Sequence, residues 1–404
     1  MAKPIVFHID VNSAFLSWTA VQMLKDGKDD IRLVPSVISG DPEKRTSVVL
    51  AKSIPAKKYN IKTGEPISMA LRKCKDLVIA PPDFQLYSKL SKAFMNICRE
   101  YTPTLEKFSI DECFLDMSGM DKVFPDIIAT AYEIKDRIRT ELGFTVNVGV
   151  GSNKLLAKMA SDFEKPDKVH TLFDYEIKEK MWTLPVRDLL YLGKATAEKL
   201  DKLYIKTIGD LAQTDIRTLK SLVGNKASEQ LHNFANGIDD DLVSSEPREV
   251  KSYGHSITVE ENVTDKETAY RLLLSLTDAS ASRMRASGVK AYCVSVSIRD
   301  NNFNNKSHQK HFNTPTDITY DIYEEVKRLF DEVWNGNAPL RLLGVTLSEV
   351  TNESEEQLTL FNSDFSHTEK KQKVDAAVDA IRNRFGDSKL VLGSTMHTQR
   401  PKKK

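Results

Sequence analysis

Residues 106–118, EKFSIDECFLDMS, place two adjacent carboxylates, Asp111 and Glu112, inside an otherwise apolar run. Ionised side chains in an apolar setting are unfavourable unless they are paired or coordinate a metal, and neighbouring side chains on a regular strand point to opposite faces. We therefore expect the chain to turn here, in a tight hairpin between residues 108–110 and 113–117. That hairpin would hold both carboxylates at the lip of a sheet. A solvated surface turn is the competing interpretation.

A third carboxylate follows the first apolar run of the chain. Residues 4–10, PIVFHID, are rich in β-formers and end on Asp10, and residues 12–24 continue at helical spacing. Asp10 is thus expected at the carboxyl end of a strand, where open α/β sheets place their ligands. Two such strands side by side would gather Asp10, Asp111 and Glu112 within a few ångströms. Three hard oxygen ligands suit Mg²⁺.

Composition bounds the class of protein. The 404 residues suffice for several domains, and 58 basic against 57 acidic side chains give a formal net charge of +1. Overall charge therefore does not indicate a nucleic-acid partner, and such binding would have to come from local patches. No apolar run approaches membrane-spanning length and the first residues lack the layout of a signal peptide, so we expect a cytoplasmic protein without membrane association.

The four cysteines are Cys74, Cys98, Cys113 and Cys293. They lack the close spacing of a zinc site and the density of a disulfide scaffold, which favours reduced thiols. Cys113 lies beside the two carboxylates, but no motif supplies the histidine and oxyanion hole that a nucleophile needs. We interpret it as a packing residue.

Several segments have the composition of phosphate-binding elements. After short strands expected at 34–38 and 47–51, residues 48–67, VVLAKSIPAKKYNIKTGEPI, are basic and fit either a solvated face or a cradle for a triphosphate. Residues 149–166, GVGSNKLLAKMASDFEKP, place a glycine turn before a basic helix, which is weak support for phosphate binding. Residues 184–213 predict two short helices with a tight connection, which fits a helix-hairpin-helix or an ordinary helical pair.

The segment after residue 250 predicts a βαββαβ order, the split βαβ motif. Within residues 292–298, apolar side chains alternate with small polar ones, which indicates a half-buried strand with a small, polar outer face. Cations gather in this region and suit sequence-independent contact with a sugar-phosphate backbone. The ones we assign to DNA binding are Arg283, Arg285, Arg299, Lys306 and Lys310.

The C-terminal segment begins as an acidic linker. It carries the apolar plug QLTLF at residues 357–361, followed by a helical pattern over 370–385 and a basic tail. Such a plug either folds back onto its own domain or inserts into the groove of a partner.

Three motifs together resemble the Y-family, or translesion, DNA polymerases, the DNA polymerase IV and UmuC-like group. They are HIDVNSAF at 8–15, SIDECFLD at 109–116 and GVGSNKLLAKMASDFEKP at 149–166. The resemblance implies an α+β multidomain fold. Its parts would be a palm with a mixed sheet and small fingers in 1–183 (fingers about 33–80), a helical helix-hairpin-helix thumb in 184–243, a βαββαβ little finger in 244–350, and a clamp-binding tether with a C-terminal helix and tail in 351–404.

The resemblance also implies a catalytic centre. Asp10 and Asp111 would hold two Mg²⁺ ions with the help of the Val11 carbonyl, while Glu112 would bind the metal that activates the primer 3′-hydroxyl. The activity implied is template-directed DNA synthesis of low fidelity and low processivity past lesions. Other classes remain open: a non-catalytic, clamp-bound DNA-binding protein, a polymerase that depends on other subunits, or a nucleotidyl cyclase that uses the same palm.

The resemblance gives nucleotide-binding roles to three further residues. Lys57 and Lys165 would contact the triphosphate, although many relatives carry Arg at the position of Lys57 and Tyr at that of Ile54. Phe15 matches the steric gate that excludes a 2′-hydroxyl, and it also lies at helical spacing to Trp18, as a core residue would.

The partners implied are primer-template DNA, deoxynucleoside triphosphates and a sliding clamp, bound by a monomer. QLTLF is similar to the pentapeptide with which bacterial polymerases hold the clamp. The residues assigned to the clamp are Gln357, Leu358, Leu360 and Phe361.

Overall fold

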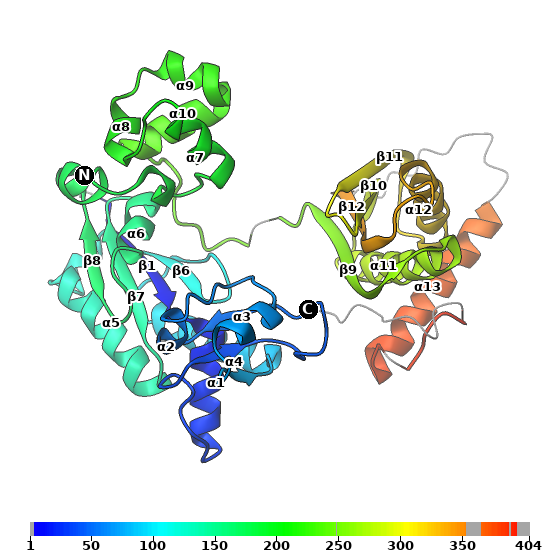
Figure 1. Cartoon of the computed structure of the whole chain (residues 1–404), viewed down its shortest axis with the longest axis horizontal. Helices are drawn as coiled ribbons and strands as arrows, with labels where there is room; N and C mark the ends of the chain where they lie inside the picture. The colour runs from blue at the N-terminus through cyan, green and yellow to red at the C-terminus, as the bar shows by residue number, and fades with distance from the viewer. Residues whose placement is uncertain (1–3, 248, 353–364, 388, 394–404) are drawn as a thin grey trace. The chain divides into compact units, whose positions relative to one another are not determined.

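A computed structural model describes residues 4–247, 249–352, 365–387 and 389–393. The chain divides into two compact units, Met1–Pro247 and Arg248–Lys404 (Figure 1). The segment expected to bind a clamp, residues 357–361, lies outside the described residues.

A five-stranded mixed sheet in the order β5-β6-β1-β7-β8 organises the first unit. β1 pairs antiparallel with both β6 and β7, whereas β7 and β8 are parallel. The strands are β1 Val6–Val11, β5 Leu105–Lys107, β6 Glu112–Asp116, β7 Val146–Gly151 and β8 Val169–Leu172.

The predicted acidic hairpin is confirmed, since β5 and β6 pair antiparallel on either side of residues 108–111. Its first strand ends at Lys107 and does not include residues 108–110. The reason is local: the backbone amides of Phe108 and Ser109 both donate to the carbonyl of Glu112, 3.1 Å away in each case, which closes the turn.

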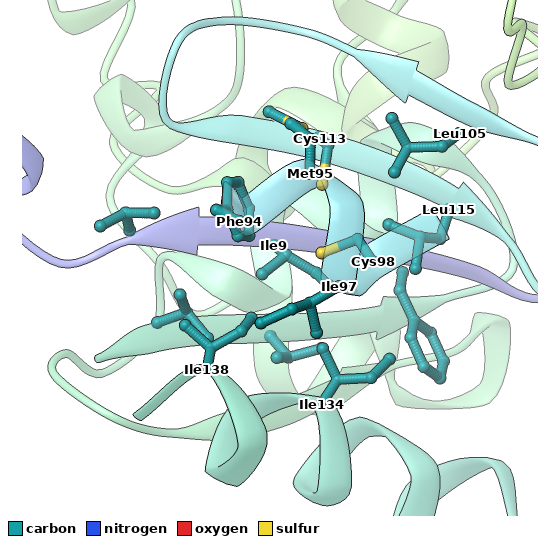
Figure 2. Close-up of a cluster of buried hydrophobic side chains, with 14 of the residues drawn as sticks. Ile9, Phe94, Met95, Ile97, Cys98, Leu105, Cys113, Leu115, Ile134 and Ile138 are labelled. Atoms are coloured by element: carbon teal, nitrogen blue, oxygen red, sulfur yellow. The ribbon is translucent and has the colours of Figure 1, made fainter. Parts of the chain in front are cut away.

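Helices cover both faces of this sheet because alternate strand residues point in opposite directions. Apolar side chains of β1 and β6, such as Ile9 and Leu115, pack with α4 and α5, as Figure 2 shows. Cys113 is buried in the same cluster, where burial raises the pKa of its thiol, so the prediction of a packing role is confirmed. The helices are α1 Ala14–Lys25, α4 Phe84–Arg99, α5 Ile127–Leu142 and α6 Lys154–Ser161.

The other face of the sheet is covered by α6. The glycines before that helix, Gly149 and Gly151, allow it to pack closely on β7. A Cβ atom added to Gly149 would lie 1.9 Å from the Ala157 carbonyl oxygen, and one added to Gly151 would lie 2.6 Å from the Ala157 amide nitrogen. Only glycine therefore lets α6 approach β7 this closely.

The remainder of the first unit is a small sheet and a helical segment. The sheet, in the order β3-β2-β4, lies at the predicted finger residues. The elements are β2 Ser36–Ile38, β3 Ala51–Lys52, α2 Ile54–Lys57, α3 Ile67–Lys73 and β4 Val78–Ala80, then α7 Lys194–Asp201, α8 Ile208–Gln213, α9 Ile216–Val223 and α10 Asn225–Ala235. The strand predicted over 47–51 is wrong except for Ala51, because residues 47–49 bond instead to residues 64–67. The predicted helical pair is α7 and α8.

The second unit has the predicted βαββαβ order, with an antiparallel sheet ordered β11-β10-β12-β9. Apolar residues of the sheet, α11 and α12 form its core. The elements are β9 Ser252–Val263, α11 Lys266–Ala286, β10 Lys290–Asp300, β11 Asn305–Thr316, α12 Thr319–Val333, β12 Leu340–Thr351 and α13 Phe365–Phe385. Among the helices of the described ranges, none is both long and apolar enough to cross a bilayer.

α13 confirms the C-terminal helical pattern and is held to α11 by buried ion pairs. Arg382 donates to Asp278 over 2.8 Å, and Arg285 donates to Asp379 over 2.7 Å. The side chains of Arg382 and Asp278 are 1% and 7% exposed. A buried charge left without its partner is costly, so these pairs fix where the helix docks.

We predict that Gly149→Ala lowers the free energy of unfolding of the first unit by about 3 kcal/mol, because α6 must move away from β7 to admit the methyl group. Urea unfolding followed by circular dichroism measures the change. Gly193→Ala is the matched control, since a Cβ there meets nothing within 4 Å. Equal midpoints for the two variants would contradict the packing role.

Candidate active site

The antiparallel pairing of β1 with β6 brings the acidic residues of the two motifs together. Asp10 and Glu112 are directly opposed in the register, and the backbone amide of Val11 donates to the carbonyl of Asp111 over 3.0 Å. Asp10 therefore stands at the end of its strand, as predicted, beside the start of β6. The neighbouring strand runs in the opposite direction, so the lip is formed by one strand end and one strand start.

Basic side chains neutralise this acidic lip. Lys158 of α6 donates to Glu112 over 2.6 Å, and Lys165, just beyond α6, pairs with Asp10 and lies 2.7 Å from Asp162. The hydroxyl of Ser109 donates to Asp111 over 2.6 Å. With these partners, one oxygen from each of the three carboxylates cannot be chosen so that all three lie within 4.8 Å of one another in the described part of the chain, so the carboxylates are further apart than the few ångströms predicted.

Asp10 has an altered acidity. Burial raises its pKa to about 6, helped by the charges of Glu112 and Asp111, while the pairing with Lys165 acts in the opposite direction. A half-buried carboxylate with two acidic neighbours gains from an added cation, because a nearby positive charge favours its ionised form. The lip is thus suited to bind positive charge.

Two further polar contacts, one behind the lip and one on the neighbouring strand β5, were not predicted from the sequence. His8 is fully buried, its Nδ1 lies 2.8 Å from the Ser161 hydroxyl, and burial followed by the charge of Lys158 holds its pKa well below the usual value. Lys154 donates to Glu106 over 2.8 Å. The only local signal for His8 was a histidine inside an apolar strand.

A cavity of about 370 Å³ opens beside the acidic lip, and it is lined by two of the three predicted nucleotide-binding residues, Phe15 and Lys57. Asp10, Val11 and Asp111 line it from the palm sheet, Phe15 lines it from α1, and Lys57 lines it from α2. Lys52 also lines it, and burial followed by the charge of Lys57 lowers the pKa of its ammonium group. An adjoining pocket is lined by Lys57 and Lys165 together.

Phe15 combines the two roles that the sequence left open. Its ring is half-buried and stacks on that of Tyr87, with centroids 4.5 Å apart and an angle of 6° between the planes, while another part of it lines the cavity. The Tyr87 hydroxyl lies 2.9 Å from that of Thr19. Tyr87 therefore holds the orientation of Phe15, a role that its helical spacing on α4 did not reveal.

Two asparagines position the segment that carries Lys165. The Asn147 amide donates to the carbonyls of Ser161 and Glu164 over 3.0 and 2.7 Å, and the backbone amide of Asp167 donates to the side chain of Asn12 over 2.9 Å. Asn12 in turn donates to Asn147 over 3.1 Å. This buried network fixes the approach of Lys165 to the lip.

The structure does not bring the five predicted DNA-binding cations to one surface. Residues directly opposed in an antiparallel pair share a face, and Lys306 and Lys310 oppose the core residues Ile298 and Val294. They stand on the helix side of the edge strand. Arg299 lies on the open face of the sheet, where it donates to Asn305 over 2.7 Å.

The two remaining cations belong to α11. Arg285 is 12% exposed and is engaged by Asp375 and Asp379 of α13, so it is not available to a phosphate backbone. Arg283 lies 3.3 Å from His255 of β9. The prediction that these five cations gather in a local patch was therefore wrong, because α13 and the strand register place them on different surfaces.

The residues at the lip fit a hard divalent cation. The donors there are carboxylate oxygens and a strand-end backbone, with the neutral His8 behind them, and Mg²⁺ prefers such all-oxygen surroundings. An acidic lip beside a cavity lined by lysines is suited to metal-assisted chemistry on a phosphate group.

Comparison with protein families agrees with this class. The impB/mucB/samB family matches residues 9–162, its C-terminal domain matches residues 250–360, and the thumb domain of DNA polymerase-iota matches residues 187–239. A Y-family DNA polymerase chimera shares the fold, with a TM-score of 0.75 over 86% of this chain and 100% of the chimera at 23% identity. The chain belongs to the impB/mucB/samB family, the Y-family DNA polymerases, and the predicted fold class is confirmed.

Within that family the chain is most simply compared with DNA polymerase IV. It is 44% identical to DNA polymerase IV of Clostridium acetobutylicum, over 96% of this chain and 97% of the relative. It is 37% identical to DNA polymerase IV of Acetivibrio thermocellus, over 95% of both chains, and 34% identical to DNA polymerase IV 1 of Bacillus subtilis, over 99% and 95%.

Proposed function

We propose that this chain, a DNA-directed DNA polymerase, performs translesion synthesis of low fidelity and low processivity by two-metal nucleotidyl transfer. The observation that carries the proposal is the acidic lip of Asp10, Asp111 and Glu112 beside a cavity lined by Phe15 and Lys57. Low fidelity is supported by the small fingers, whose three strands are at most three residues long and leave little surface to check a base pair.

Asp10 and Asp111, with the carbonyl of Val11, are the residues that would hold two Mg²⁺ ions, with Glu112 on the side of the primer. When bound, the ions would supply a lowered pKa at the primer 3′-hydroxyl and stabilise charge on the phosphates. The chain itself provides the cationic walls. Lys57 reaches the cavity from α2, and Lys165, which neutralises Asp10 in the structure, shares the adjoining pocket with it. We propose that both neutralise the triphosphate.

We predict that Asp111→Asn lowers primer extension with Mg²⁺ by roughly 100-fold or more, because loss of a metal ligand removes several kcal/mol of transition-state stabilisation. Extension is measured on undamaged and lesion-bearing templates. Asp116→Asn, at the end of β6 that lies away from Asp111, is the matched control and should retain activity.

Three outcomes separate the candidate functions. Lesion bypass that is lost only in Asp111→Asn supports the proposal. DNA binding without extension in the unaltered protein would favour a non-catalytic protein, and extension that appears only with added cell extract would favour dependence on other subunits.

We predict that Phe15→Ala admits ribonucleotides, since the stacked ring lines the cavity and, in the role we propose for it, leaves no room there for a 2′-hydroxyl. Relative use of ribonucleotides over deoxynucleotides should rise roughly 10- to 100-fold, the range of steric discrimination in a pocket. Single-nucleotide incorporation measures the ratio. Phe84→Ala is the control, because Phe84 contacts the edge of Phe15 at a centroid distance of 6.1 Å and does not line the cavity. An unchanged ratio in Phe15→Ala would show that the ring is only a packing residue.

For DNA we propose two contact surfaces. One is the helix-hairpin-helix of α7 and α8, where Gly193 caps α7 and the amides of a helix start can face phosphates. The other is the open face of the second unit's sheet, which carries Arg299 among small residues such as Ser297 and Gly344. Small polar side chains let a sugar-phosphate backbone approach closely.

We predict that Arg299→Gln weakens binding to primer-template DNA and reduces the slope of log affinity against log salt by about 0.9, the share of one phosphate contact. Fluorescence anisotropy at several salt concentrations measures both. Lys310→Gln, on the opposite face of the sheet, is the matched control. A larger effect from Lys310→Gln would place the DNA on the helix side.

Low processivity implies a tether, which would raise the effective concentration of the enzyme at a primer end. We propose that Gln357, Leu358, Leu360 and Phe361 bind a sliding clamp, on the basis of their sequence alone. The division into palm and fingers (1–183), thumb (184–243), little finger (244–350) and tether (351–404), the cytoplasmic location and the monomeric state stay predictions.

A further inference from the structure

Three residues with different ligand chemistry meet on the sheet of the second unit. Cys293 of β10, His311 of β11 and Glu349 of β12 each present one ligand atom, and these atoms all lie within 4.8 Å of one another. Each residue comes from a different strand, and the three strands are neighbours in the order β11-β10-β12. The wide spacing of the cysteines along the chain gives no sign of such a site, because its three residues are brought together across the sheet.

Strand register explains how Cys293 and His311 meet. They are directly opposed in the β10–β11 pair, and Cys293 lies two residues before Ser295, so both side chains belong to the open face of the sheet. Cys293 as a whole residue is only 1% exposed, whereas the side chains of His311 and Glu349 are 55% and 58% exposed. The thiol thus forms the floor of a shallow site, and the imidazole and carboxylate form its rim.

Glu349 reaches this site through an unusual backbone conformation. In a regular strand its side chain would share the face of Leu347, which is fully buried in the core. Glu349 has instead a φ of 53°, in the left-handed region that side-chain-bearing residues rarely adopt within a strand. Its carboxylate lies 3.4 Å from Nδ1 of His311. Backbone outliers of this kind are concentrated at ligand sites.

We propose that Cys293, His311 and Glu349 bind a divalent transition metal ion of borderline softness, of which Zn²⁺ is the type. A thiolate, an imidazole and a carboxylate are the three classes of zinc ligand, and thiolate is a poor ligand for Mg²⁺ or Ca²⁺. The 3.4 Å between Nδ1 and the carboxylate oxygen matches the roughly 3.3 Å edge of a tetrahedron whose metal bonds are about 2.0 Å long. The exposed rim leaves the fourth position to water.

Binding has a defined proton and charge balance. The thiol of Cys293 loses its proton to solvent as the metal–sulfur bond forms, and thiolate plus carboxylate neutralise the two charges of the ion. The bound ion would join three strands at one point. It would thereby pin β11, which is the edge strand of the sheet, to β10 and β12.

The test uses the full-length protein, stripped with a chelator and titrated with Zn²⁺ against a fluorescent indicator, and in parallel with Co²⁺. We expect one equivalent to bind that is retained in Asp111→Asn, and the Co²⁺ form to show thiolate-to-cobalt charge-transfer absorption. Cys293→Ser should abolish that absorption. His311→Asn and Glu349→Gln, at exposed positions that do not endanger the fold, should each weaken Zn²⁺ binding by at least about tenfold, no less than the loss of an outer-shell partner costs.

Matched variants separate this site from other sites. His308→Asn removes a second exposed histidine of β11, one that pairs with Glu332 over 2.6 Å without a nearby thiol, and it should leave binding unchanged. Cys74→Ser controls for a buried thiol elsewhere, and Asp111→Asn controls for ions held at the acidic lip. The proposal is overturned if the absorption persists in Cys293→Ser, or if His311→Asn and Glu349→Gln bind Zn²⁺ as tightly as the unaltered protein, which would leave an ordinary histidine–carboxylate pair.

Discussion

The antiparallel register of β1 with β6 sets the positions of all three acidic residues. The rest of the first unit compensates the negative charge that this register brings together. Placing Asp10 opposite Glu112 concentrates negative charge in a half-buried setting. Burial disfavours the ionised form of Asp10 there. Lys158 can reach Glu112 only because α6 lies close against the sheet. That closeness in turn requires glycine at positions 149 and 151, where any side chain would collide with the helix backbone. The charge compensation at the lip therefore depends on the close packing of α6, and that packing depends on the two glycines.

Local patterns predicted much of this fold. The apolar run that ends on Asp10, the turn forced by adjacent Asp111 and Glu112, and the βαββαβ order of the second unit are all readable over short windows, because strand alternation and helical spacing are local properties. The lysines that pair with the buried carboxylates, in contrast, lie far from them in the sequence. Lys158 lies 46 residues from Glu112 and Lys154 lies 48 from Glu106, so the basic helix that suggested phosphate binding is committed to the palm's own carboxylates. Nothing in the spacing of the lysines encodes that pairing.

The distribution of cations in the second unit shows the same limit. Alternation along β10 correctly predicted a face of small polar residues, but which face an edge-strand lysine joins depends on the register between β10 and β11. Lys310 opposes Val294 and so belongs to the helix side. Arg285 is not part of the predicted patch for a different reason. It pairs with Asp379, which lies on α13, 94 residues further along the chain. A cluster of like charges in sequence is thus a weak guide to a cluster on a surface.

Register also accounts for the difference in ligand chemistry between the two metal sites that we propose. At the lip, a strand end and a strand start bring together oxygen donors only, a set that favours Mg²⁺. On the sheet of the second unit, direct opposition brings sulfur and nitrogen together, and the left-handed conformation of Glu349 adds an oxygen. The softness of the donor atoms distinguishes the two ligand sets. Thiolate and imidazole favour zinc-like ions, whereas carboxylate oxygens suit Mg²⁺. The two sites therefore favour different ions, although both are built across antiparallel strands, a pair of strands at the lip and three strands in the second unit.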